Sequence, residues 1–592
     1  MSASAVRVPV GLTELAASAA HQFGDAVAQR FLVDGEWRQR SFVELHDVVA
    51  AIARVLHEGG VRPGMRVALL CATRPEWTIC DLAITRLGAV CVPIYPTSST
   101  GQIQWVLRDS AATAVVAETA QHLEQIAQLR DELPDLRLVW GIEAFSTLGA
   151  ALADLTAAPG PTAGASTGLP QVEADPDEVF TIVYTSGTTG NPKGCMFTHA
   201  NVSTIVATLQ RMTETAPVDV LFAYLPLAHL LTRMLQVYAL HTGAAIAYSS
   251  GNIRAILGEL AEVAPTHLPS VPTLFEKIYS VVTAQITAEG NIDRAGLAGL
   301  VELGLRVRNA RDHGGTLTEE DARRFAEADE RLFAPVRAAF GGRLKAALTG
   351  AAPIAANILE FFFAAGVPIF EAYGMTESTA IISANTPGAW RAGTVGRPVP
   401  GVDVRIAEDG EVCARSAGVF PGYWHNEAAT AQTIVDGWLH TGDLGALDAD
   451  GFLQITGRKK DMIITSAGKN ITPANLENDL RQSSRIAEAV MLGDHRPYPV
   501  ALIVLEPEQL AVWAEHGETD DDAWVRDEEL HGILAVEIDA VNARYSPPER
   551  IRAFAVLPAP FTIESGELNP TFKVRRAVVA QHYAQVVDSL CP

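Results

Sequence analysis

Residues 184–194 read Tyr-Thr-Ser-Gly-Thr-Thr-Gly-Asn-Pro-Lys-Gly and follow the largely apolar run Val179–Tyr184. The run predicts a buried strand, so the polar stretch is expected to be a loop at its end. Glycines let the backbone approach a ligand and turn its N–H groups inward, while hydroxyls and a lysine supply hydrogen bonds and charge for phosphate oxygens. The stretch therefore predicts a phosphate-binding loop that contains Thr185, Ser186, Gly187, Thr188, Thr189, Gly190 and Lys193.

A plain polar turn is the alternative, and an ordered string of this kind after a buried strand argues against it. The loop is not of the Walker A type, because no Gly-Lys-Ser or Gly-Lys-Thr is present.

The segments around this loop alternate between strand and helix patterns. Arg66–Cys71 and Cys91–Pro96 are typical of strands, and Pro75–Gly88 between them is typical of a helix, with Pro at its start and Gly at its end. Ser99–Ser110 has the pattern of a capped helix and precedes a short strand at Ala114–Ala117. This order of elements predicts a parallel sheet covered by helices.

The pattern changes twice further along the chain, whose 592 residues are too many for one hydrophobic core. From Thr394 to Thr456 short strands alternate with Gly and Asp-Gly turns, which predicts an antiparallel barrel or sheet. Beyond Lys460 a compact α+β pattern begins. The predicted fold class is α/β, with flavodoxin-like α/β subdomains and a β-barrel-like subdomain in residues 1–460 and a small α+β domain in residues 461–592.

Composition restricts the class of partner. Lys and Arg total 45 against 69 Asp and Glu, and a net charge of −24 argues against general affinity for nucleic acid or anionic lipid. The six cysteines lie far apart without a Cys-x-x-Cys, which is typical of reduced residues in a cytosolic protein. Met1–Val10 lacks a signal-peptide pattern, and no apolar run reaches membrane-spanning length. We expect a cytoplasmic protein without a transmembrane segment; loose peripheral membrane contact stays open.

Residues 184–194 resemble the signature loop of the adenylate-forming superfamily, which comprises acyl-CoA synthetases, luciferases and peptide-synthetase adenylation domains. Further matching stretches follow in family order, from about Val27 to Arg576. The resemblance implies an enzyme that uses ATP, Mg²⁺ and coenzyme A and has a mobile C-terminal domain. Fatty acid, ATP and CoA are the implied partners, no nucleic acid is expected, and the sequence leaves the oligomeric state open.

Two matching stretches imply contacts to adenine, phosphate and metal. In residues 373–377, Tyr-Gly-Met-Thr-Glu, the resemblance implies that Tyr373 stacks on adenine, Thr376 contacts the α-phosphate and Glu377 holds Mg²⁺. A carboxylate suits that role because magnesium prefers hard oxygen ligands. Residues 349–353 are similar to the adenine-side loop of the family, formed here by Gly350, Ala351 and Ala352, although Gly is commoner at the two alanines.

Other stretches imply ribose, catalytic and hinge residues. Asp443, in residues 438–443, is the implied ribose ligand, with Arg458 beside it; an ionised carboxylate can accept from both ribose hydroxyls. Lys573 matches the lysine that reaches into the site during adenylation, where an ammonium can stabilise charge moving onto pyrophosphate. Lys460 matches the family hinge.

The resemblance also implies residues for the thiol and acyl substrates. His229, in residues 225–229, matches the histidine over the acyl carboxylate. Gly468, Lys469 and Asn470 are similar to the loop that faces the pantetheine tunnel after the C-terminal domain has rotated.

Several stretches resemble the long-chain branch specifically: Cys91–Ser99, Ser270–Tyr279, Phe340–Leu344 and the helical excursion Ser280–Phe340. Thr273 and residues 231–233 depart from the usual pattern, as does Asn569, which stands where Thr is usual. The predicted reaction converts a fatty acid, ATP and CoA to acyl-CoA, AMP and pyrophosphate. A fatty acyl-AMP ligase that loads a carrier protein is the nearest alternative. A non-catalytic nucleotide-binding regulator and a luciferase-like oxygenase are further ones, and chain-length preference stays open.

Overall fold

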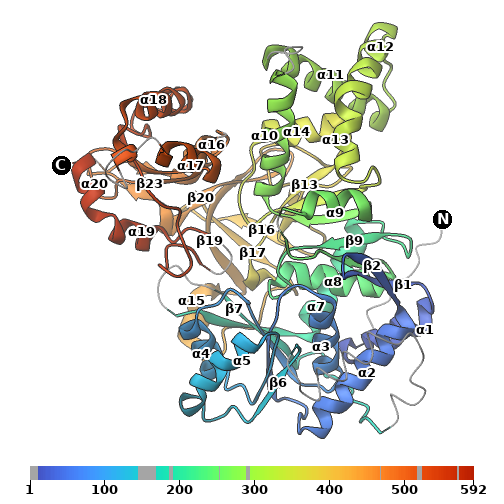
Figure 1. Ribbon diagram of the computed structural model, residues 1–592. Helices are drawn as coiled ribbons and strands as arrows, with labels where there is room; N and C mark the ends of the chain where they lie inside the picture. The colour runs from blue at the N-terminus through green and yellow to red at the C-terminus, as the bar shows by residue number, and fades with distance from the viewer. Residues whose placement is uncertain are drawn as a thin grey trace.

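The computed structural model describes residues 11–143, 168–185, 191–252, 254–288, 294–466, 468–483, 485–515, 523–569 and 573–591. Ser186–Gly190 of the predicted phosphate loop lie outside the described residues. Figure 1 shows two large α/β layers, an antiparallel sheet beside them and a separate C-terminal unit at one side.

A six-stranded sheet carries the strand that precedes the phosphate loop. Its order is β6-β5-β3-β4-β7-β8, with β7 and β8 antiparallel and the other neighbours parallel. The strands are β3 (Arg66–Leu70), β4 (Val90–Ile94), β5 (Ala114–Ala117), β6 (Leu138–Gly141), β7 (Val179–Thr185) and β8 (Lys193–Thr198), and the helices α3 (Pro75–Arg86), α4 (Thr100–Asp109) and α5 (Ala120–Gln128) connect them. A capping box at Ser99 starts α4, as its sequence predicted. The expected parallel sheet is confirmed.

A nine-stranded sheet forms the second layer, in the order β15-β14-β13-β12-β11-β9-β10-β1-β2. Neighbours from β13 to β1 are parallel and both edges are antiparallel. The strands are β1 (Val27–Val33), β2 (Glu36–Ser41), β9 (Val220–Ala223), β10 (Ala245–Tyr248), β11 (His267–Ser270), β12 (Ala346–Thr349), β13 (Ile369–Tyr373), β14 (Ser383–Ala384) and β15 (Arg397–Pro398).

Helices pack on both large sheets and between them (Figure 1). They are α1 (Leu15–Phe23), α2 (Phe42–Glu58), α7 (His199–Met212), α8 (Leu230–Thr242), α9 (Ile256–Val263), α10 (Pro272–Ala288), α11 (Arg294–His313), α12 (Glu319–Ala328), α13 (Ala334–Ala339) and α14 (Ala356–Ala365). The described parts of the excursion Ser280–Phe340, residues 280–288 and 294–340, are mainly helical, as expected, and α11 packs against α14.

A buried ion pair joins the two large sheets. Arg233 on α8 is fully buried and makes two bonds to Asp81 on α3, Nη2 to Oδ1 at 2.5 Å and Nε to Oδ2 at 3.0 Å. Its Nη1 donates to Thr181 Oγ1 on β7 at 2.6 Å, and its guanidinium lies 4.4 Å from the centre of the Phe180 ring. Because the charge is fully paired and hydrogen-bonded, this arginine can be buried between the layers.

A five-stranded antiparallel sheet follows: β16 (Asp403–Ile406), β17 (Glu411–Arg415), β18 (Ile434–Val435), β19 (Trp438–Leu447) and β20 (Leu453–Arg458), with α15 (Glu427–Thr433) beside it. The order is β16-β17-β19-β18, and β20 also pairs with β19. This is the antiparallel arrangement that the Gly and Asp-Gly turns predicted.

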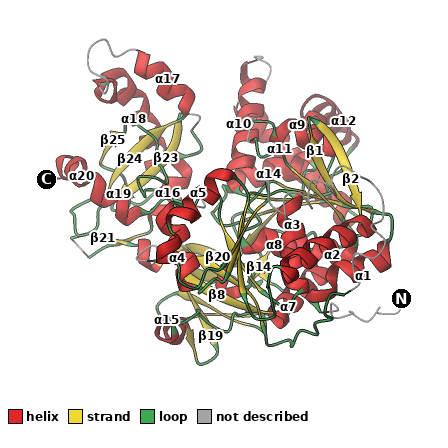
Figure 2. Cartoon of the chain, turned by 60° about the horizontal axis from the view of Figure 1, so that its bottom comes forward, coloured by secondary structure: helices red, strands yellow, loops and turns green. Residues whose placement is uncertain are grey.

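The remaining elements form the C-terminal unit, which stands to one side of the large sheets in both views (Figures 1 and 2). It contains β21 (Ile463–Ile464), β22 (Asn470–Ile471), β23 (Ile486–Leu492), β24 (Val500–Leu505) and β25 (Ala553–Val556) with α16 (Pro473–Leu480), α17 (Pro507–Glu515), α18 (Glu528–Asn542), α19 (Arg576–His582) and α20 (Ala584–Leu590). Among the described residues, no helix combines the length and apolarity needed to cross a membrane.

Candidate active site

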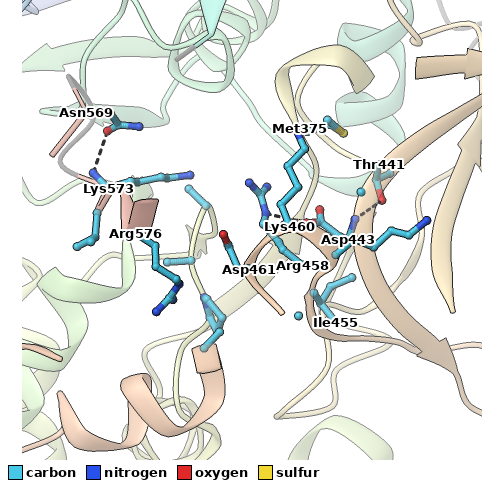
Figure 3. A pocket seen from close by; sticks show the side chains of 18 of the residues that line it. Met375, Thr441, Asp443, Ile455, Arg458, Lys460, Asp461, Asn569, Lys573 and Arg576 are labelled. Atoms are coloured by element: carbon cyan, nitrogen blue, oxygen red, sulfur yellow. Dashed lines mark hydrogen bonds and ion pairs between the residues drawn. The ribbon is translucent and has the colours of Figure 1, made fainter. Parts of the chain in front are cut away.

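A cavity of about 1700 Å³ lies where the two large sheets, the antiparallel sheet and the C-terminal unit meet. Figure 3 shows Asn569, Lys573 and Arg576 on one side of it and Thr441, Asp443 and Arg458 on the other. The fold thus brings together most of the site residues predicted from the sequence. Those that line the cavity are Thr185, Lys193, His229, Gly350, Ala351, Ala352, Tyr373, Thr376, Glu377, Asp443, Arg458, Lys460 and Lys573.

The predicted ribose ligand is held in a fixed orientation. Asp443 on β19 stands opposite Arg458 on β20 in the antiparallel register, and Arg458 Nε lies 2.7 Å from Asp443 Oδ1. Tyr373, the last residue of β13, donates its hydroxyl to Asp443 Oδ2 at 2.7 Å. Burial, and then the charge of Asp443, raises the pKa of the Tyr373 hydroxyl, so it remains a donor. The last residues of β13 and β20 therefore fix one carboxylate on β19 that is only 3% exposed.

Glu411 holds the backbone next to Asp443 and was not predicted from the sequence. Its Oε1 accepts from the Gly442 backbone N–H at 2.8 Å, and its Oε2 lies 2.9 Å from His440 Nδ1 and 3.0 Å from Lys459 Nζ. Burial would raise the pKa of Glu411, but hydrogen bonds from these three partners outweigh burial and lower it. Glu411 thereby ties the backbone next to Asp443 to the residue next to Lys460.

A group of possible metal ligands includes this glutamate. The ligand atoms of Glu411, Cys413 and His440 all lie within 4.8 Å of one another. The ammonium of Lys459 already neutralises Glu411, at 3.0 Å. We therefore interpret Glu411, Cys413 and His440 as an internal hydrogen-bond network on β17 and β19.

The predicted adenine-side loop is tightly packed against β13. A Cβ on Gly350 would lie 2.7 Å from the Ala372 carbonyl oxygen. Ala351 adopts a φ of +69°, a left-handed conformation that explains why glycine suits this position. Gly374 has even less room, because a Cβ there would lie 2.0 Å from the Ala380 carbonyl oxygen.

Glu371 lies on β13, lines the cavity and is buried. Burial raises its pKa to about 8, against a hydrogen bond from the Ile354 backbone. Sequence reasoning missed it, because a single Glu in a strand gives no sign of how deeply it will be buried.

The predicted magnesium ligand contacts Tyr423, a third residue that sequence reasoning missed. Glu377 is 7% exposed, and its Oε1 accepts from the Tyr423 hydroxyl at 2.7 Å. The Lys193 ammonium lies 4.9 Å from the centre of the Tyr423 ring. The Phe-Pro-Gly-Tyr stretch at 420–423 gave only the signal of a turn, since Pro-Gly marks turns and loops.

Lys573 and His229 both line the cavity, and the charge of the lysine acts on the imidazole. Burial and then the charge of Lys573 lower the pKa of His229 to about 4. Lys573 is exposed to solvent inside the cavity, and the partial loss of water around its ammonium, then the positive Arg458, lower its pKa to about 8, while Asp443 opposes this shift. The Lys573 backbone N–H donates to Asn569 Oδ1 at 2.9 Å, so Asn569 can serve where the family usually has Thr.

Arg576 anchors the segment that carries Lys573. Its Nη1 and Nη2 lie 2.6 and 2.9 Å from the two carboxylate oxygens of Glu477 on α16, and Nη1 also donates to the Met491 carbonyl at 2.6 Å. The start of α19 is therefore fixed to the centre of the C-terminal unit, a few residues after Lys573.

The predicted thiol-side loop is not part of this cavity. Gly468 has a φ of +74°, its N–H donates to the Thr465 carbonyl, and the Thr465 N–H donates to the Lys469 carbonyl. Neither Gly468, Lys469 nor Asn470 lines the cavity, whereas Lys460 does. The structure thus brings Lys573, the predicted adenylation lysine, to the cavity and leaves Gly468, Lys469 and Asn470 outside it.

Comparison with known proteins agrees with this arrangement. Residues 16–424 match the family model described as AMP-binding enzyme, and residues 460–591 match that of the AMP-binding enzyme C-terminal domain. The chain is 40% identical over 584 residues to the long-chain-fatty-acid–CoA ligase FadD15 of Mycobacterium bovis, covering 96% of this chain and 94% of the relative. It is 29% identical to long-chain-fatty-acid–CoA ligase 1 of Cavia porcellus, covering 94% and 82%.

Solved structures share the fold. The anthranilate CoA ligase AuaEII in complex with anthranoyl-AMP aligns with a TM-score of 0.73 at 21% identity, covering 99% of this chain and 100% of that one. The A domain of the carboxylic acid reductase from Segniliparus rugosus aligns with a TM-score of 0.76 at 21% identity, covering 98% and 94%. With family models matched over most of its length, the chain belongs to the AMP-binding enzyme family.

Proposed function

We propose that this chain is an AMP-forming long-chain fatty acid–CoA ligase, which makes acyl-CoA, AMP and pyrophosphate through an acyl-adenylate. The observation that carries the proposal is that one cavity gathers Asp443, Glu377 and Lys573 from three separate parts of the fold. The relative at 40% identity, named as a long-chain-fatty-acid–CoA ligase, supports the choice of substrate.

The first half-reaction requires mainly positioning and charge stabilisation. A carboxylate oxygen of the fatty acid bonds to the α-phosphorus of ATP, the bond from that phosphorus to the bridging oxygen breaks, and pyrophosphate leaves with the electron pair. No general base is needed, because the carboxylate is already ionised at neutral pH. Lys573 would stabilise the charge that moves onto pyrophosphate, while Asp443 and Arg458 hold the ribose side.

The donor set fits a magnesium ion carried by ATP. Glu377 offers a hard carboxylate oxygen: Oε1 accepts from the Tyr423 hydroxyl, which leaves Oε2 as the oxygen for a cation. When bound, Mg²⁺ would neutralise phosphate charge. Lys193, and in our prediction Ser186–Gly190, would hold the phosphate oxygens, with Thr376 at the α-phosphate.

His229 orients the acyl carboxylate without adding charge. With its pKa lowered to about 4, the imidazole is neutral at pH 7 and can donate one hydrogen bond. It stands at the start of α8, where it lines the cavity.

The second half-reaction needs a different arrangement of the C-terminal domain, residues 461–592. The sulfur of CoA bonds to the acyl carbon, the bond from that carbon to the AMP oxygen breaks, AMP leaves and the thiol proton passes to solvent. We propose that rotation about Lys460 withdraws Lys573 and brings Gly468, Lys469 and Asn470 to the thiol path.

The six described cysteines, all free and buried, support the expectation of a cytoplasmic location.

Product analysis with and without CoA tests the proposal. Purified protein is given ATP, Mg²⁺ and fatty acids from short to very long, and pyrophosphate and acyl products are measured. CoA-dependent acyl-CoA formation that is highest with long chains is expected. Acyl-adenylate release with no thioester would instead favour an acyl-AMP ligase that loads a carrier protein, and no pyrophosphate with any acid would refute adenylation.

A further inference from the structure

Tyr423 is fixed by its backbone to the strand that follows the phosphate loop. Cys195 on β8 and Tyr423 form an antiparallel bridge. On either side of it, the Met196 N–H donates to the Gly422 carbonyl at 3.1 Å and the Trp424 N–H donates to the Gly194 carbonyl at 2.7 Å. The position of the tyrosine is thus set by the same strand that begins with Lys193.

The side chain of Tyr423 contacts two predicted phosphate-site residues at once. Its hydroxyl donates to Glu377 Oε1 at 2.7 Å, and its ring centre lies 4.9 Å from the Lys193 ammonium, within the range of a cation–π contact. Tyr423 is 7% exposed and lines the cavity. A phenol is protonated in neutral solution, so the hydroxyl can donate to the carboxylate.

The hydrogen bond decides which oxygen of Glu377 is available. A carboxylate without such a partner can rotate and present either oxygen or both to a cation. With Oε1 bonded to Tyr423, Oε2 is the oxygen left for a ligand. Hydrogen-bond partners of this kind, one step removed from a metal, orient the ligating group and are worth a large factor in metal affinity.

We propose that Tyr423 is a positioning residue for adenylation: it holds Glu377 so that Oε2 meets the divalent cation of the nucleotide, and it sets the place of Lys193 beside the same phosphates. This role rests on the proposed function. The ring also packs edge-on against Phe420 at 4.9 Å between centres, and this contact needs no hydroxyl. Tyr423→Phe therefore separates positioning from packing.

The test measures cation binding directly. Mn²⁺ binding to the full-length protein with a non-hydrolysable ATP analogue is followed by electron paramagnetic resonance for wild type, Tyr423→Phe and Tyr238→Phe. Tyr238 is a matched control, because it is also buried and its hydroxyl bonds Thr213 at 2.8 Å outside the cavity. We expect Tyr423→Phe to weaken Mn²⁺ binding about tenfold or more, and Tyr238→Phe to leave it unchanged.

Activity gives a second readout. In pyrophosphate–ATP exchange, the Mg²⁺ concentration for half-maximal rate should rise for Tyr423→Phe by a similar factor, and excess Mg²⁺ should restore much of the rate. In a Glu377→Gln background, Tyr423→Phe should have no further effect on Mn²⁺ binding, because the carboxylate it orients is gone.

The role of Tyr423 would be overturned by an Mn²⁺ affinity of Tyr423→Phe equal to wild type, or by an equal loss in Tyr238→Phe. An effect of Tyr423→Phe that persists undiminished in the Glu377→Gln background would also overturn it. These outcomes are separate from failure of the proposed function, which would appear as wild-type protein that releases no pyrophosphate with any fatty acid.

Discussion

Lys573 makes the adenylation rate depend on pH in a defined direction. Its pKa is lowered to about 8, first by desolvation between the cavity walls and then by Arg458, so the ammonium is present below pH 8 and is lost as the pH rises through 8. With a pKa of about 8, the charged fraction is about 90% at pH 7 and about 10% at pH 9. Because kcat/KM reports the free enzyme, kcat/KM for ATP should fall about tenfold between these values.

The assay is pyrophosphate–ATP exchange with a saturating fatty acid and no CoA, so that ionisation of the thiol does not contribute. Lys573→Arg keeps its charge throughout this range and should lack the decrease near pH 8, although a bulkier guanidinium should lower the absolute rate. Lys573→Ala should lose most of the exchange at every pH.

Glu371 provides the necessary control, because burial also raises its pKa to about 8. Its carboxyl group is neutral below that pH and charged above it, so it could produce a decrease in the same range. Glu371→Gln removes this group and should retain the decrease if Lys573 is responsible. A wild-type profile that is flat from pH 7 to 9, an unchanged decrease in Lys573→Arg, or its loss in Glu371→Gln would refute the reasoning.

Three further substitutions test the site and its framework. Asp443→Asn removes the charge of the ribose-side carboxylate and should weaken ATP binding by about 1.5–3 kcal/mol, seen as a higher KM for ATP with a smaller change in kcat. Gly374→Ala would place a Cβ 2.0 Å from the Ala380 carbonyl oxygen. The variant should therefore have a lower melting temperature and no binding of an ATP analogue. A wild-type melting temperature and wild-type binding would show that the backbone around Gly374 can move aside. Asp81→Ala leaves Arg233 buried without its carboxylate and should cost about 3–5 kcal/mol in urea unfolding, whereas a loss under about 1 kcal/mol would mean that water replaces the partner.

The sequence by itself determined the local elements and the residue types of the site. The helix predicted at Pro75–Gly88 is α3, Pro75–Arg86, and the helix predicted at Ser99–Ser110 begins at the capping box of Ser99. Such features depend on residues only a few positions apart, so apolar periodicity and end residues are sufficient to predict them. Resemblance to a known superfamily supplied roles for the motif residues, and those roles, like the domain boundary near Lys460, remain predictions.

Only the tertiary structure decided which of these groups meet and how their environments change them. Tyr423 is 46 positions from Glu377, and Arg233 is 152 positions from Asp81, so neither contact leaves a pattern in a single sequence. Burial likewise becomes visible only when distant segments pack around a side chain, as it does for Glu371. A local pattern specifies strands and turns, but strand register and the packing of sheets on helices place side chains from remote segments together and set the dielectric around them.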